Sequence, residues 1–199
     1  FDDALECRFR GQVENIGSGL KPRLRLGGAA PETLDAALDD HASIIGYLLD
    51  EVIAPRAGAL RAVGHRVVHG GTVFSEPVRI DDDTRRSITE LAPLAPSHQP
   101  HNLAGIDAVA ASAPGVLQVA CFDTAFHRTI PEHRQLMALP RRFADEGLRR
   151  FGFHGLSYER IVSRLPYVLG NRANGPVVIA HLGNGCSLSG VVAGHCAWT

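Results

Sequence analysis

Hydrophobic and polar positions along the chain follow a period of two in some segments and of three to four in others. Residues 5–16 and 23–26 alternate with period two and flank a glycine turn, which predicts two antiparallel strands. Residues 34–49 carry apolar side chains at spacings of three and four, which predicts a helix that ends before Pro55. Strands and helices in mixed order are typical of the α/β class with a mixed sheet.

Two apolar segments end abruptly on polar residues. Residues 116–122 are too uniformly apolar for a strand with one wet face, so we expect a central strand covered on both sides, with Asp123 at its carboxyl end. Residues 62–69 predict a second buried strand, which stops at Gly70-Gly71. Ligands of open α/β sheets bind beyond the carboxyl ends of strands, so Asp123 is a candidate for chemistry. The alternative is an aspartate that caps the following turn.

The remaining pattern predicts three helices and a hairpin. The helices cover residues 82–91, 102–113 and 158–169, the last capped by Ser157, and a loop with three prolines separates the first two. A strand over residues 177–181 turns through Gly183-Asn184-Gly185 into residues 187–193.

Composition excludes several classes of protein. The chain has 199 residues and is 45% hydrophobic, which suffices for a packed core. Its 20 basic and 21 acidic residues nearly cancel, so we expect neither a nucleic acid nor an anionic membrane as partner. Four cysteines without a C-x-x-C motif, and the lack of any long apolar run, predict reduced thiols in a cytoplasmic protein.

Polar residues gather at the predicted element ends in a set that suits phosphoryl transfer. An arginine, an aspartate, histidines and a glycine turn are the groups that position a phosphoryl group and neutralise its charge. A metal site at His65 and His69 is excluded, because residues four apart in a strand lie about 13 Å from each other. The other histidines outside these clusters are interpreted as surface or hydrogen-bonded residues without a specific role: His41, His127, His133 and His195.

Five ordered segments resemble the acetate kinase family. They are GHRVVHGG (64–71), SHQPHNLAGI (97–106), CFDTAFHRTIPE (121–132), RRFGFHGLSYERI (149–161) and AHLGNGCSLSGVVAG (180–194). The resemblance implies reversible transfer of a phosphoryl group from ATP, with Mg²⁺ or Mn²⁺, to acetate, giving acetyl phosphate and ADP. It also implies an α/β, ribonuclease-H-like fold of two domains, as in actin and Hsp70, and a homodimer. Residues 1–124 are expected to form most of the first domain, and residues 125–199 the beginning of the second, nucleotide-binding domain.

The resemblance also assigns roles to individual residues. Arg66 resembles the arginine that binds the carboxylate or the transferring phosphoryl group, Asp123 the essential acid, and His154 the histidine that stabilises the transition state. His98 matches a further active-site histidine, and Val68 and Phe153 match walls of the acyl pocket. The nucleotide-binding residues implied are those of the glycine turn: His181, Leu182, Gly183, Asn184 and Gly185.

Some expected parts of the family pattern lie outside the sequence. The chain starts at Phe1, and the first phosphate loop, a second arginine and the carboxylate associated with Mg²⁺ are expected in a longer parent, so the piece alone is expected to be inactive. Ser97 stands where the family usually has Leu. Two alternatives remain open: a propionate kinase of the same family, and a non-catalytic binding module of the same fold.

Overall fold

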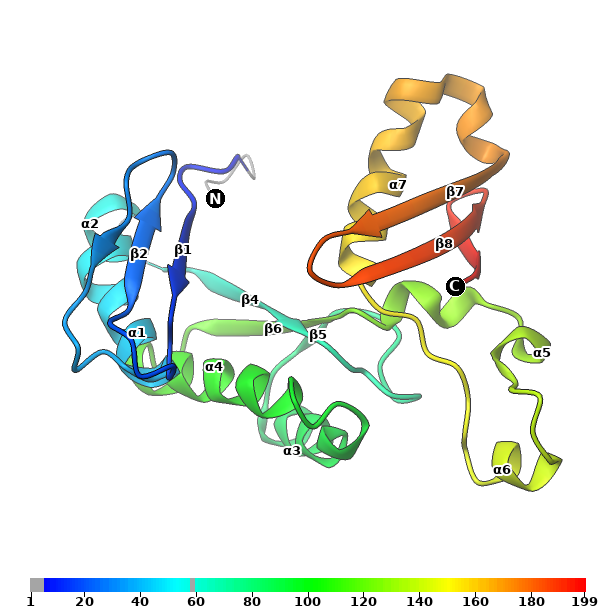
Figure 1. Cartoon of the computed structure of the whole chain (residues 1–199), viewed down its shortest axis with the longest axis horizontal. Coiled ribbons are helices and arrows are strands. Elements are labelled where there is room, and N and C mark those ends of the chain that lie inside the picture. Colours follow the sequence, from blue (N-terminus) through cyan, green and yellow to red (C-terminus); the bar gives the residue numbers. More distant parts are fainter. Residues whose placement is uncertain (1–5, 58–59) are drawn as a thin grey trace. The chain divides into compact units, whose positions relative to one another are not determined.

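The computed structural model describes residues 6–57 and 60–199, and these residues form two compact units (Figure 1). Of the described residues, the first unit contains 6–57, 60–63 and 103–116, and the second contains Gly64–Asn102 and Leu117–Thr199. These units are defined by contacts between residues, so they do not test the domain boundary expected at residue 124, which stays a prediction. Within the described residues, no helix has the length and apolar character that crossing a membrane requires.

The first unit packs an antiparallel sheet against helical turns. Its strands are β1 (Gly11–Glu14), β2 (Arg23–Leu26) and β3 (Glu32–Thr33), and Val13 lies opposite Leu24. The predicted antiparallel pair is therefore confirmed, although the first strand is shorter than residues 5–16 and residue 5 lies outside the described residues. The core of this unit consists of Leu24, Leu34, Ile44 and Val52.

The helix predicted over residues 34–49 begins later and extends further than expected. Helix α1 (His41–Tyr47) starts after Asp40, whose carboxylate accepts the Ser43 N–H at 2.7 Å and so caps the helix. A π-helical turn, η1 (Leu48–Ile53), leads into α2 (Ala54–Ala57), which includes Pro55. The end predicted before Pro55 is wrong, because the wider turn, in which the Ala54 N–H reaches Leu49 O, accommodates a residue that has no N–H of its own.

The sheet that carries the candidate site has the order β4-β6-β5, with β4 (Ala62–Val67), β6 (Leu117–Phe122) and β5 (Val78–Arg79), and β5 is antiparallel to β6. The central position predicted for β6 is confirmed. Burial on both faces is wrong, since exposure alternates along β6 and Leu117 is 43% exposed, and β4 alternates in the same way. An apolar sequence does not require two covered faces, because apolar atoms make up more than half of a folded protein's surface.

Two helices lie between β5 and β6 in the sequence. Helix α3 (Asp82–Glu90) confirms its prediction and is capped by Asp81, which accepts the Thr84 N–H at 2.8 Å. Helix α4 (Gln99–Ser112) begins three residues before the predicted start, and a short 3₁₀ turn, η2 (Ala92–Leu94), lies within the predicted loop. Pro100 did not prevent the earlier start, because proline is tolerated in the first turn of a helix.

The rest of the second unit places a long helix against an antiparallel sheet. Strands β7 (Pro176–Leu182) and β8 (Cys186–Val192) form the predicted hairpin, and β9 (His195–Trp198) pairs with β8. Helix α7 (Gly155–Leu169) begins after His154, so the prediction that Ser157 caps it is wrong. Shorter turns complete the unit: η3 (Ala125–Thr129), α5 (Glu132–Gln135), α6 (Arg141–Asp145) and η4 (Gly170–Asn174). The core here is formed by Phe126, Ile130, Tyr158, Ile179, Val191 and Cys196.

Candidate active site

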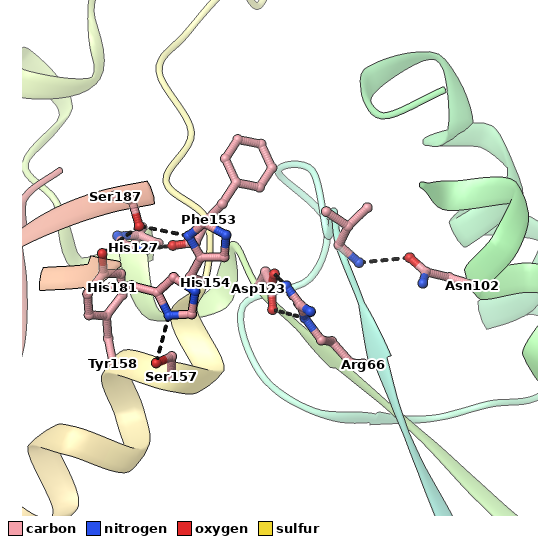
Figure 2. A network of polar contacts seen from close by, with 11 residues as sticks. Arg66, Asn102, Asp123, His127, Phe153, His154, Ser157, Tyr158, His181 and Ser187 are labelled. Carbon is pink, nitrogen blue, oxygen red and sulfur yellow. Dashed lines mark hydrogen bonds and ion pairs between the residues drawn. The ribbon is translucent and has the colours of Figure 1, made fainter. Parts of the chain in front are cut away.

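Arg66 and Asp123 form a forked ion pair at the carboxyl ends of two neighbouring strands (Figure 2). Arg66 Nη2 lies 2.7 Å from Asp123 Oδ2, and Nε lies 3.1 and 3.2 Å from the two carboxylate oxygens. Asp123 is 1% exposed, whereas the Arg66 side chain is 63% exposed. The hydrogen bond with Asp123 raises the pKa of Arg66. The carboxylate therefore accepts hydrogen bonds from an arginine on the adjacent strand, and the outer side of that arginine is left accessible.

The main chain of Asp123 joins three segments of the second unit. Its N–H donates to Val67 O at 3.0 Å, and its carbonyl accepts the Gly155 N–H at 2.9 Å. The next residue, Thr124, accepts the Gly70 N–H on Oγ1 at 2.9 Å. A side chain at position 155 would place its Cβ 2.2 Å from Asp123 O, so only glycine fits at the start of α7. The ends of β4 and β6 and the beginning of α7 are thus fixed to one another at Asp123.

His154 occupies the turn before α7 in the left-handed region, with φ 61° and ψ 24°. Its Nδ1 lies 2.8 Å from Ser187 Oγ, and the Tyr158 hydroxyl lies 2.5 Å from the same oxygen (Figure 2). The charges of Asp123 and Arg66 both act on this ring, and burial, followed by the charge of His181, lowers the pKa of His154. Arg66 and Asp123 therefore lie near enough for their charges to influence the His154 ring.

His181 stacks on His154 at the end of β7. The ring centroids are 4.1 Å apart at an interplanar angle of 11°, and His181 Nδ1 lies 3.1 Å from Ser157 Oγ. The hairpin loop closes with a hydrogen bond from Gly183 N–H to Gly185 O at 3.0 Å. Neither of these glycines has a positive φ. A Cβ at position 185 would lie 2.9 Å from His154 Nε2, so a larger residue here would require the His154 ring to shift.

The residues predicted to form the acyl pocket lie beside a buried histidine. Phe153 meets His69 edge to face at a centroid distance of 5.6 Å, and both Phe153 and Val68 are half-buried. The Val68 N–H donates to Asn102 Oδ1 at 3.0 Å. Burial lowers the pKa of His69, whose Nδ1 accepts the Gly71 N–H at 2.9 Å. Apolar side chains and a histidine with a depressed pKa thus adjoin the end of β4.

His98 lies at the start of α4, and its side chain is exposed. Its Nδ1 is 2.8 Å from Ser97 Oγ, which is exposed as well. Among the contacts of residues 6–57 and 60–199, none joins His98 to Arg66, Asp123 or His154. The role that the family resemblance implies for His98 stays a prediction.

Three residues to which sequence reasoning assigns no role lie around His154. Ser187 and Tyr158 form the hydrogen-bonded chain to its Nδ1. Of the two alternatives for His127, surface or hydrogen-bonded, the second is confirmed: the side chain is only 5% exposed, and its Nε2 lies 3.0 Å from Phe153 O. Its buried position follows from a 3₁₀ turn packed under α7, which the periodicity of the sequence does not predict.

The described part of the chain does not by itself form a metal site. It contains no group of three or more His, Cys, Asp or Glu side chains arranged to hold an ion. The charge of Asp123 is paired with that of Arg66. Burial, followed by the charge of Asp123, raises the pKa of Glu159. Mg²⁺ commonly takes one or two carboxylates together with phosphate oxygens and water, so these residues offer at most part of such a set.

Four buried or half-buried histidines predict how stability depends on pH. Burial is the main cause that lowers the pKa of His65, His69, His127 and His154 from 6.5. Below about pH 6.5 the unfolded chain therefore binds more protons than the folded one, and the free energy of unfolding falls as the pH falls. Urea denaturation at pH 7.5, 6.5 and 5.5 is expected to show this loss. A His65→Gln variant should lose less stability than the parent, while Gln at the exposed His133 should change nothing; rising stability at acid pH would contradict the assignment.

Comparison with known proteins identifies the family of the chain. The model of the acetokinase family matches residues 6–199. The chain belongs to the acetokinase family. Similar acetokinases include the acetate kinase of Rhizobium meliloti, 46% identical over 197 residues, or 96% of this chain and 50% of that protein. The acetate kinase of Methylocella silvestris is 56% identical over 130 residues, or 65% of this chain and 32% of that protein.

Solved structures of acetokinases share the fold. The acetate kinase of Porphyromonas gingivalis matches with a TM-score of 0.83 and 34% identity, over 97% of this chain and 51% of that chain. A propionate kinase from Francisella tularensis matches with a TM-score of 0.86 and 31% identity, over 98% and 51%. The predicted α/β fold of this family is therefore confirmed. The chain spans about half the length of those curated acetokinases that match nearly all of it.

Proposed function

We propose that the whole protein containing this chain is an acetate kinase, which transfers a phosphoryl group reversibly from ATP to acetate and forms acetyl phosphate and ADP. The observation that carries this proposal is the Arg66–Asp123 pair with His154 in electrostatic reach, in a chain 46% identical to an acetate kinase over 96% of its length. An arginine, a carboxylate and a histidine at adjoining strand ends suit a transition state whose charge spreads over phosphoryl oxygens.

In this proposal each residue has a distinct part in the reaction. The outward N–H groups of Arg66 bind the acetate carboxylate and then the transferring phosphoryl group, while Asp123 holds the guanidinium in place and sets the charge of the site. The lowered pKa of His154 favours the neutral ring. In the proposed tautomer Nδ1 accepts from the Ser187 hydroxyl and Nε2–H donates to a phosphoryl oxygen. Val68 and Phe153 form walls of the pocket for the acyl group, and residues 181–185 bind the nucleotide phosphates.

The proposal also includes a divalent cation, a homodimer and a cytoplasmic location. Mg²⁺ or Mn²⁺, when bound with ATP, neutralises phosphate charge, and its ligands are expected among residues other than those described. A homodimer follows from the family resemblance. A cytoplasmic location is supported by the thiols, since Cys7, Cys121, Cys186 and Cys196 are all free.

Formation of acetyl hydroxamate from acetate, ATP and Mg²⁺ in the presence of hydroxylamine tests the activity of the whole protein. We expect acetyl phosphate at a rate typical of enzymes, about 10 turnovers per second. Binding of nucleotide without turnover by a well-folded preparation would instead favour the non-catalytic module.

A propionate kinase is the second candidate, supported by the structural match to the propionate kinase of F. tularensis. If Ser97 faces the acyl pocket, we expect a higher kcat/KM for acetate than for propionate, because its hydroxyl, which pairs with His98, stands where the family usually has an apolar residue. Ser97→Leu is expected to move the ratio toward propionate by about tenfold, the lower end of what one methylene contributes in an apolar pocket. An unchanged ratio would place Ser97 away from the acyl chain, and a preference for propionate in the parent would favour the second candidate.

A further inference from the structure

His127 lies in the core beneath the segment that carries His154. The ring packs against Tyr158 at a centroid distance of 5.5 Å, and both of its nitrogens have partners inside the protein. Nε2 lies 3.0 Å from Phe153 O, and Nδ1 lies 3.2 Å from Cys196 Sγ. A histidine that is 5% exposed and paired at both nitrogens is fixed in position and in orientation.

The partners of His127 determine which nitrogen carries the proton. Phe153 O is a carbonyl and can only accept, so Nε2 carries hydrogen and donates. Burial is the main cause that lowers the pKa of His127, which favours a neutral ring with a free lone pair on Nδ1. The Cys196 thiol lies 3.2 Å from Nδ1 and 3.5 Å from Trp198 O, and its single hydrogen can be donated to either acceptor. The ring is thus held as one tautomer between β9 and the turn before α7.

The backbone just before His154 packs closely against the His127 ring. A Cβ added at Gly152 would lie 2.3 Å from His127 Cγ and 2.5 Å from Nδ1. The ring therefore contacts the main chain at residue 152 and binds the carbonyl of residue 153. Immediately after these residues comes His154, in the left-handed conformation that turns its ring toward Ser187.

We propose that His127 is a positioning residue, which holds the Phe153–His154 peptide and thereby directs the His154 ring toward the transferring phosphoryl group. This inference rests on the proposed function, because it assumes that His154 acts on a phosphoryl group. His127 itself does not touch the substrate. A purely structural histidine would affect only stability, whereas a positioning histidine also changes the properties of His154.

Two substitutions separate the hydrogen bond from the packing. His127→Gln keeps an N–H donor near the position of Nε2, and His127→Phe keeps a ring but removes the donor. In the whole protein we expect His127→Phe to lower kcat about tenfold, with KM for acetate and ATP within about twofold, because small errors in the placement of a reacting group cost mainly rate. His127→Gln is expected to recover most of that loss. His133→Gln, at an exposed position, is the matched control and should retain the parent's kcat.

A titration of His154 by NMR gives a readout that does not depend on turnover. The His154 ring resonance is assigned in each variant and followed between pH 5 and 8. We expect the midpoint to shift in His127→Phe and to stay at the parent's value in His127→Gln. An unshifted midpoint in His127→Phe, or equal losses of kcat in the two variants per folded molecule, would overturn the positioning role. Failure of the parent to form acetyl phosphate would instead refute the proposed function, and the titration would still decide whether His127 controls His154.

Discussion

Replacing Asp123 by Asn in the whole protein is expected to lower kcat at least about 100-fold without unfolding the chain. Asn has nearly the same shape and keeps an oxygen that accepts from Arg66, and the main-chain bonds of residue 123 to Val67 and Gly155 remain. The negative charge is lost. Removing one preorganised charged or hydrogen-bonding group from a site of this kind costs about 10²–10³ in rate.

The measurement is kcat from the hydroxamate assay, with circular dichroism and urea denaturation as checks on folding. Asp145→Asn is the matched control, since Asp145 is exposed and pairs with Arg141 at only 3.8 Å. That variant should retain the parent's kcat. Turnover near the parent's level in a well-folded Asp123→Asn protein would contradict the catalytic assignment and leave Asp123 with a purely structural role.

Gly155→Ala is expected to produce the largest loss of stability of any single methyl addition in this region. The new Cβ would lie 2.2 Å from Asp123 O and 3.0 Å from both Asp123 C and Phe126 Cβ. These are mostly backbone atoms of a strand end, so the clash cannot be relieved by turning a side chain. Overpacking of a rigid site typically costs 1–3 kcal/mol, and we expect about 3 kcal/mol here. The hydrogen bond from Gly155 N–H to Asp123 O would be strained as well.

Urea denaturation of Gly155→Ala and Gly28→Ala side by side measures this effect. Gly28 has an ordinary φ, and no other atom lies within 4 Å of a Cβ built on it, so alanine at that position should be neutral or slightly stabilising. A loss of less than about 1 kcal/mol in Gly155→Ala would contradict the close contact at Asp123 O.

The elements that were predicted correctly are those that depend on residues close together in the sequence. The hairpin of β7 and β8 follows from two apolar runs around a glycine turn, and α3 follows from its capping aspartate and helical spacing. The helix near residue 41 was misplaced because Leu34 and Leu38 continue its spacing although they lie outside it. They contribute to the same core from an irregular segment. Apolar spacing reports which residues face a core, and it does not report where a helix begins.

The candidate site required contacts that no local pattern encodes. Arg66 and Asp123 are 57 residues apart in sequence, and their pairing depends on β4 and β6 being neighbours. The burial of His127 depends on contacts with β9, 69 residues away. Gly185, which the family resemblance places in the nucleotide-binding turn, also leaves space for the His154 ring, a contact that the sequence does not predict. Sequence motifs indicate the candidate site residues, whereas the contacts that hold these residues in place come from tertiary packing.

The forked pair between Arg66 and Asp123 also determines what the site presents to an incoming anion. A guanidinium has five N–H groups, and Asp123 takes the one on Nε and one on Nη2. The other three face away from the carboxylate on a side chain that is 63% exposed. An arriving anion therefore meets a ready set of donors and need not displace Asp123 to use them. Because the charge of Asp123 is paired with Arg66, this aspartate repels that anion less than an unpaired carboxylate would. Arg66 can therefore bind Asp123 and an incoming anion at the same time.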